Sequence, residues 1–322
     1  MIKPLLMISR RNFIRNHAML ALGASLPSLT LLKTLVGEVG INLFSLPKML
    51  EQDLEASFAL LQQLGYKKIE FFGPYTFSTE AAKSKWAVTA KAVGFSGSGF
   101  FGKDSNSIKQ LLQKHGMTAP SLHTDLDTLR SNMSGLAEAA HILGSKYVVL
   151  PAIPDAERQH LDGYKRMADD FNRIGADAKS KGIRFAYHNH GYGLSSMEGQ
   201  LPLDIIFNQT DPSLVFFEMD LYWTTAGGAD PIALLKQHKD RYKLMHVKDM
   251  KQKVRFSGDG GNAKQWIELW DYMTTAGDGI LDLPNIIKTA KANGVEHFIV
   301  EQDTVKSPEI ALKCSIDYLK TL

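Results

Sequence analysis

Cysteine is almost absent from this chain of 322 residues, which excludes several kinds of site. A single residue, Cys314, cannot form an intramolecular disulfide framework or a cysteine-rich zinc site. Any metal ion bound here must therefore be held by histidine, aspartate and glutamate side chains. The sequence also lacks internal repeats, low-complexity tracts and a recognisable linker between domains.

Acidic residues are missing from residues 1–36, although this segment contains five of the 37 basic residues. Without the segment the chain has 32 basic and 34 acidic residues, so its net charge is −2 rather than +3. The remaining chain therefore has no basic excess of the kind that binds nucleic acid.

The same segment resembles an export signal. The run 9-SRRNFI-14 is similar to the twin-arginine motif, and a moderately apolar stretch follows at residues 18–32. Gly23 and Pro27 interrupt this stretch, which argues against a stable membrane span. We expect residues 1–36 to be a twin-arginine leader and the protein to be periplasmic or otherwise exported. The alternative is a basic, amphipathic N-terminal helix.

Eight short apolar runs alternate with long amphipathic segments along the rest of the chain, residues 37–322. Such alternation predicts parallel strands joined by helical crossovers, and eight units fit an α/β fold with a single (β/α)8 TIM barrel. An open doubly wound sheet is the alternative, but it usually has a glycine-rich phosphate loop after its first strand, and here Ser45-Leu46-Pro47 follows. The expected strands are 39–44, 68–72, 117–122, 146–150, 183–188, 214–219, 242–247 and 297–301.

Four polar residues end the fifth to eighth expected strands: His188, Asp220, His246 and Glu301. Adjacent barrel strands lie about 4.8 Å apart, so these side chains can converge at the mouth. Two imidazoles and two carboxylates suit one divalent metal ion, such as Mn, Zn, Co, Fe or Mg. The alternative is four unrelated polar strand ends.

Five further residues near strand ends are candidates for the site. His190 follows His188 by two residues, so either can be the ligand and the other a substrate contact or base. His123 is a candidate base. Glu70, Lys248 and Trp223 are candidate substrate contacts. The alternative for Glu70 is an ion pair at the barrel mouth, and for Lys248 a salt bridge to a nearby carboxylate. The alternative for Trp223 is ordinary packing.

The segments 218-EMDLYWTTAGGADP-231, 245-MHVKDM-250 and 299-IVEQD-303 resemble strand ends of the xylose isomerase-like TIM-barrel superfamily, the sugar phosphate isomerase/epimerase family. The resemblance implies one divalent metal held by Glu, Asp, His and Glu. Asp220, His246 and Glu301 match three of these positions. His188 stands where the family usually has glutamate, which weighs against a symmetric two-glutamate mechanism.

These observations lead to four hypotheses about function. The first is a metal-dependent isomerase or epimerase that acts on a sugar or keto-sugar through a metal-stabilised enediolate, with Glu301 transferring a proton and His123 or His190 returning it. The second is a lyase or dehydratase acting on keto-sugars or 3-keto-glycosides. An endonuclease IV-like nuclease and a non-catalytic sugar-binding protein are the others. The expected partner is a small carbohydrate; a homo-oligomer is left open.

Overall fold

The computed structural model describes residues 35–303 and 305–322. The arginine pair and apolar stretch of the expected leader lie outside these residues, so the twin-arginine assignment stays a prediction.

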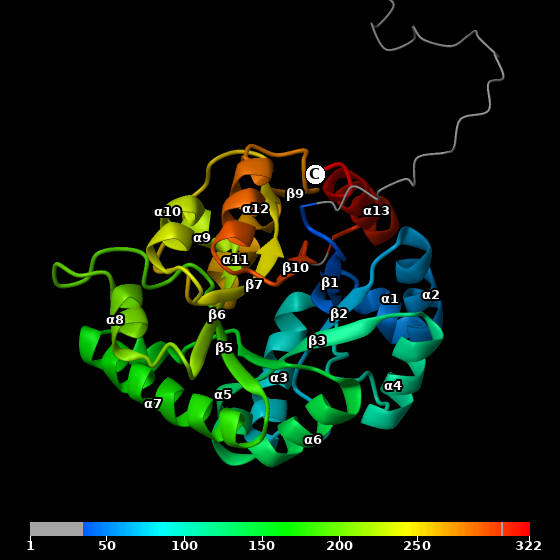
Figure 1. Ribbon diagram of the computed structural model, residues 1–322, viewed down its shortest axis with the longest axis horizontal. Coiled ribbons are helices and arrows are strands. Elements are labelled where there is room, and N and C mark those ends of the chain that lie inside the picture. The colour runs from blue at the N-terminus through cyan, green and yellow to red at the C-terminus, as the bar shows by residue number, and fades with distance from the viewer. Residues whose placement is uncertain (1–34, 304) are drawn as a thin grey trace, which may run out of the picture. The chain divides into compact units, whose positions relative to one another are not determined.

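Eight parallel strands close into a barrel in the order β1, β10, β7, β6, β5, β4, β3, β2 (Figure 1). The single (β/α)8 barrel expected from the sequence is therefore confirmed, and the strands agree with the expected ranges to within about two residues. The barrel strands are β1 (Gly40–Asn42), β2 (Lys68–Phe72), β3 (Thr118–His123), β4 (Tyr147–Leu150), β5 (Arg184–His188), β6 (Val215–Asp220), β7 (Tyr242–Val247) and β10 (His297–Val300).

Helices surround the strands in Figure 1. Capping residues and glycines in the sequence determine where these helices begin and end. In α2, for example, the Asp53 carboxylate accepts a hydrogen bond from the Ala56 N–H at the start, and Gly65 ends the helix at a φ of 99°. The helices are η1 (Leu43–Ser45), α1 (Pro47–Gln52), α2 (Leu54–Leu64), α3 (Glu80–Val93), α4 (Ser105–Lys114), α5 (Leu126–Ser131), α6 (Met133–Leu143), η2 (Asp155–Glu157), α7 (Leu161–Ser180), α8 (Pro202–Gln209), α9 (Leu221–Gly227), α10 (Pro231–Gln237), α11 (Ala263–Trp270), α12 (Leu283–Ala292) and α13 (Pro308–Leu319).

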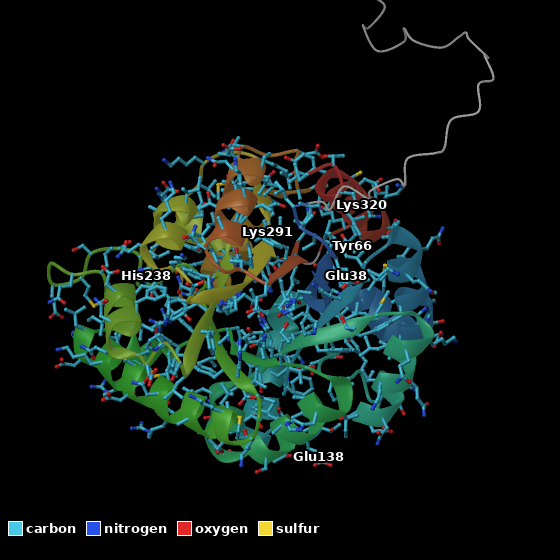
Figure 2. All side chains as sticks on the ribbon, in the orientation of Figure 1. Glu38, Tyr66, Glu138, His238, Lys291 and Lys320 are labelled. Atoms are coloured by element: carbon cyan, nitrogen blue, oxygen red, sulfur yellow. The ribbon has the colours of Figure 1, made fainter. Side chains whose placement is uncertain are left out.

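The last helix packs back on the first units of the barrel. The Tyr66 hydroxyl, just after α2, donates a hydrogen bond to the Leu312 carbonyl of α13. Lys320, just after α13, donates to the Leu64 carbonyl. Tyr66 and Lys320 are both labelled in Figure 2, where they lie at this junction.

A short antiparallel pair was not expected from the sequence, in which no hairpin signature was found. It joins β8 (Asp249–Met250) to β9 (Met273–Thr274), with α11 between them. Strands of two residues are too short to show an alternating pattern, which explains why they were missed. The buried Asp249 carboxylate stabilises the next loop by accepting hydrogen bonds from the N–H groups of Gly277, Gly279 and Leu281.

The barrel interior is layered. Its lower part is an apolar cluster that includes Val149, Ala186, Leu244 and Ile299. Because alternate residues of a strand face the same side, the inward residue two positions further along each strand lies nearer the carboxyl end. After Ala186, Leu244 and Ile299 these residues are His188, His246 and Glu301, so the apolar cluster supports a polar floor at the barrel mouth.

Among the described residues, no helix combines the length and the apolar character needed to cross a membrane.

Candidate active site

The polar floor forms because strand register places inward polar residues beside each other. His188 on β5 pairs in register with Glu218 on β6, and Asp220 pairs with His246 on β7. Glu218 and Asp220 are two residues apart, so both face inward. All four residues are at most 1% exposed. Such buried charges must be paired or must bind an ion.

Three of the four expected metal ligands, among them His246 itself, converge at the Nδ1 edge of the His246 ring. Its Nδ1 atom lies 2.8 Å from Glu301 Oε2 and 3.8 Å from Asp220 Oδ2. The fourth, His188, points its Nε2 atom at Asp220 Oδ2 from 3.7 Å. Asp220, His246 and Glu301 thus form one group of donor atoms that can hold a metal ion, with His188 beside it.

A second group lies at the Nε2 edge of the same ring and includes Glu218, which the sequence analysis missed. Glu218 Oε2 is 2.7 Å from His123 Nε2 and 3.1 Å from His188 Nδ1. Its Oε1 atom is 3.4 Å from His246 Nε2. The available signal was its spacing of two residues from Asp220 on one strand.

Lys248 forms salt bridges with carboxylates, as in the alternative to its role as a substrate contact. Its Nζ atom lies 2.9 Å from Asp220 Oδ2, 2.5 Å from Glu301 Oε2 and 3.1 Å from Asp303 Oδ1. Its side chain is 1% exposed, and it lies 5.3 Å from the ring centre of Trp223. Three carboxylates therefore share one buried ammonium group. Asp303 was also missed, although it follows Glu301 by two residues.

Glu70 is fully buried and contacts protein groups on several sides. Its carboxylate accepts hydrogen bonds from Asn42 Nδ2 at 2.8 Å and from Ser121 Oγ at 2.5 Å. It also lies 2.5 Å from His246 Nε2 and 3.2 Å from His123 Nε2. Glu70 therefore orients two of the histidines. Neither Glu70 nor Lys248, both expected to contact substrate, lines the cavity that opens at the barrel mouth.

The histidines at the barrel mouth have different pKa values because their surroundings differ. Burial lowers the pKa of His123, but the charges of Glu70 and Glu218 outweigh this and raise it to about 9. Burial, together with the charge of Lys248, lowers the pKa of His190 to about 4. Burial and the neighbouring Glu70 charge raise the pKa of Glu218 to about 7.

His190 is held in one tautomer. Its Nδ1 atom lies 2.5 Å from the Pro151 carbonyl oxygen, which can only accept, so Nδ1 must carry the proton. Neutral His190 then has a lone pair at Nε2. The indole of Trp266 packs against the imidazole, with ring centres 4.9 Å apart.

A cavity of about 380 Å³ opens above the floor. Of the residues expected in the site, six line it: His123, His188, His190, Trp223, His246 and Glu301. This volume is sufficient for a small-molecule ligand.

The donor atoms fit a divalent cation. Asp220 Oδ2 and Glu218 Oε1 are buried without a hydrogen-bond partner among the described residues. The Lys248 ammonium group is close enough to Asp220 Oδ2 for an ion pair, but its geometry is not that of a hydrogen bond to this oxygen. Buried carboxylate oxygens without donors are costly. A cation at the Nδ1 edge of His246 would satisfy Asp220 Oδ2, and one at the Nε2 edge would satisfy Glu218 Oε1.

Known proteins resemble this chain in sequence and in fold. An inosose dehydratase from Clostridium beijerinckii is 30% identical over 158 residues, which are 47% of this chain and 52% of that protein. The chain thus spans about half the length of the curated relatives that it matches.

Two solved structures share the fold at lower identity. A sugar phosphate isomerase/epimerase from Parabacteroides distasonis aligns with a TM-score of 0.68 at 23% identity, covering 91% of this chain and 96% of that one. The IOLI protein with a bound zinc atom aligns with a TM-score of 0.60 at 16% identity, covering 88% and 95%. The model of the xylose isomerase-like TIM barrel family matches residues 58–322. This chain therefore belongs to the xylose isomerase-like TIM barrel family.

Proposed function

We propose that this protein is a divalent-metal-dependent isomerase or epimerase that acts on a sugar or keto-sugar. The observation that carries the proposal is the buried group of histidines and carboxylates at the carboxyl ends of the barrel strands, directly beneath a cavity. The similarity to an inosose dehydratase in sequence and to a sugar phosphate isomerase/epimerase in fold supports the same reaction class.

His188, Asp220, His246 and Glu301 would hold the metal in this proposal. A bound divalent ion supplies Lewis acidity, which polarises a carbonyl oxygen of the substrate. The unpartnered Asp220 Oδ2 atom and the short approach of His246 to Glu301 support this assignment. The group around Glu218 is the competing position.

His190 and His123 are the proposed proton-transfer groups. Neutral His190, with its proton fixed on Nδ1, can accept a substrate proton at Nε2. His123 has a pKa of about 9 and is protonated at neutral pH, so it can donate one. Two groups whose environments push their pKa values apart are the usual arrangement of an acid and a base. Glu301 lines the same cavity as a third proton-transfer candidate.

A proton-exchange experiment tests this function. A panel of aldoses, ketoses and keto-sugars would be incubated in D₂O with metal-loaded protein, and with protein treated with EDTA, and followed by NMR. We expect metal-dependent exchange of a C–H next to a carbonyl on at least one sugar. Sugar binding without exchange on the whole panel would instead indicate a non-catalytic binding protein.

Variants of two histidines give the matched comparison. His190→Gln should lower the exchange rate by roughly 10²–10⁴-fold while leaving metal content unchanged. His160→Gln is the control, because the His160 side chain is 82% exposed. Equal rates for the two variants would remove His190 from the proposal.

A lyase is the second candidate, and a specific observation favours it. The curated relatives include several inosose dehydratases. Loss of the same carbon-bound proton can be followed by loss of a neighbouring substituent rather than by reprotonation. A dehydrated or cleaved product without an epimer in the NMR experiment would favour this candidate.

A further inference from the structure

The outer part of the cavity differs in chemistry from its floor. On one side it is lined by Trp86 and Val93 of α3, and on another by Trp266, Ile267 and Trp270 of α11. Both helices can be followed in Figure 1. Phe44 and Phe72, which contact each other edge to face at 5.2 Å, extend the apolar lining toward the barrel.

The polar atoms of two of these tryptophans already have partners. Trp86 Nε1 donates a hydrogen bond to the Ser96 carbonyl at 2.7 Å, and Trp266 Nε1 donates to the Gly260 carbonyl at 2.7 Å. These two indoles therefore offer apolar ring surface to a ligand rather than hydrogen bonds.

The outer part offers few polar side-chain atoms to a second sugar ring or a phosphate; one of them is Trp270 Nε1, which is buried without a hydrogen-bond partner among the described residues. Among the described residues that line the cavity, Lys85 is the one lysine or arginine, and it is paired with Asp127 at 2.6 Å. Most sugar hydroxyls buried against indole and aliphatic groups would lose hydrogen bonds to water without replacement. A flat apolar group would instead gain from burial and from stacking on the indoles.

We propose that the outer part of the cavity is a subsite for an aromatic substituent carried by the sugar, so that the substrate class is an aryl glycoside or its keto derivative. This inference rests on the proposed function, because it places the sugar ring on the histidine and carboxylate floor. Trp266 contacts both parts, since it lines the cavity and packs on His190. The attachment of the aryl group to the ring is thus expected near His190.

Calorimetric titration of the metal-loaded full-length protein tests the subsite. The ligands are the phenyl and methyl glycosides of glucose, galactose and xylose, with glucose 6-phosphate as the anionic comparison. We expect at least one phenyl glycoside to bind on the order of tenfold more tightly than its methyl counterpart, because a phenyl ring buries much more apolar surface than a methyl group.

Tryptophan variants locate the effect. Trp266→Ala and Trp86→Ala should each reduce the phenyl preference several-fold, and Trp86→Ala should leave the affinity for the methyl glycoside within about twofold. Trp266→Phe should keep much of the preference, which separates loss of ring surface from misfolding. Val88→Ala is the matched control on α3, because Val88 is 71% exposed and does not line the cavity.

The outcomes distinguish the subsite from the function on which it rests. Equal binding of phenyl and methyl glycosides would overturn the subsite and leave the sugar enzyme intact. Tightest binding of glucose 6-phosphate would also overturn it. If none of these glycosides bound and the D₂O experiment showed no exchange on any sugar, both proposals would fall.

Discussion

Replacing Lys248 with methionine is the most direct test of how the carboxylates at the barrel mouth are held. The Lys248 ammonium group contacts three buried carboxylates, those of Asp220, Glu301 and Asp303, at distances between 2.5 and 3.1 Å. Removal of one partner from a buried ion pair costs about 3–5 kcal/mol, because the remaining charge is left uncompensated. We expect the metal-free variant to lose a free energy of unfolding of this size, equivalent to roughly 5–10 °C in melting temperature.

A divalent metal should reverse part of this loss, because the ion would replace the missing positive charge between Asp220 and Glu301. A ligand at 100 times its dissociation constant stabilises the folded state by about 2.7 kcal/mol. Urea unfolding with and without added Mn²⁺ or Zn²⁺ measures both quantities. Lys85→Met is the control, since the Lys85 side chain is 74% exposed and its surface pair should contribute less than about 1 kcal/mol. A Lys248→Met variant that loses no more stability than this control, or that metal does not stabilise, would refute the reasoning.

Three further predictions concern the metal, the pH dependence of stability and export. Asp220→Asn should abolish stoichiometric metal binding measured by elemental analysis, whereas Glu218→Gln should retain the ion; the reverse result would move the metal to the group around Glu218. Burial lowers the pKa of His297 to about 4, below its ordinary value of 6.5, so the unfolded chain binds this proton first and stability falls as pH drops between these values. His297→Gln should therefore reduce the loss of stability between pH 6.5 and 4 by at most about 3 kcal/mol in urea unfolding. Replacing Arg10 and Arg11 together with lysine should keep the protein in the cytoplasm of a twin-arginine-competent host, and unchanged export in a cell fractionation would contradict the leader assignment.

The polar residues at the strand ends show which parts of the site can be predicted from local sequence patterns. His188, Asp220, His246 and Glu301 each follow a short apolar run, and in a parallel barrel such ends share one rim. Their presence at the mouth could therefore be predicted from single strands. Glu218 was overlooked because it lies within the apolar run 215-VFFEM-219, where nothing local distinguishes an inward carboxylate from a strand interior.

Alternation of strand and helix signals, and the polar residue at the end of each strand, are properties of neighbouring residues along the chain. The sequence by itself therefore determined the barrel class, the strand boundaries and most of the residues at its mouth. Only the tertiary structure decided which of these groups are partners: Glu218 meets His123 across 95 residues of sequence, and His246 belongs to both donor groups. Those contacts depend on strand register and barrel closure, which are set by packing between distant segments and leave no local signal.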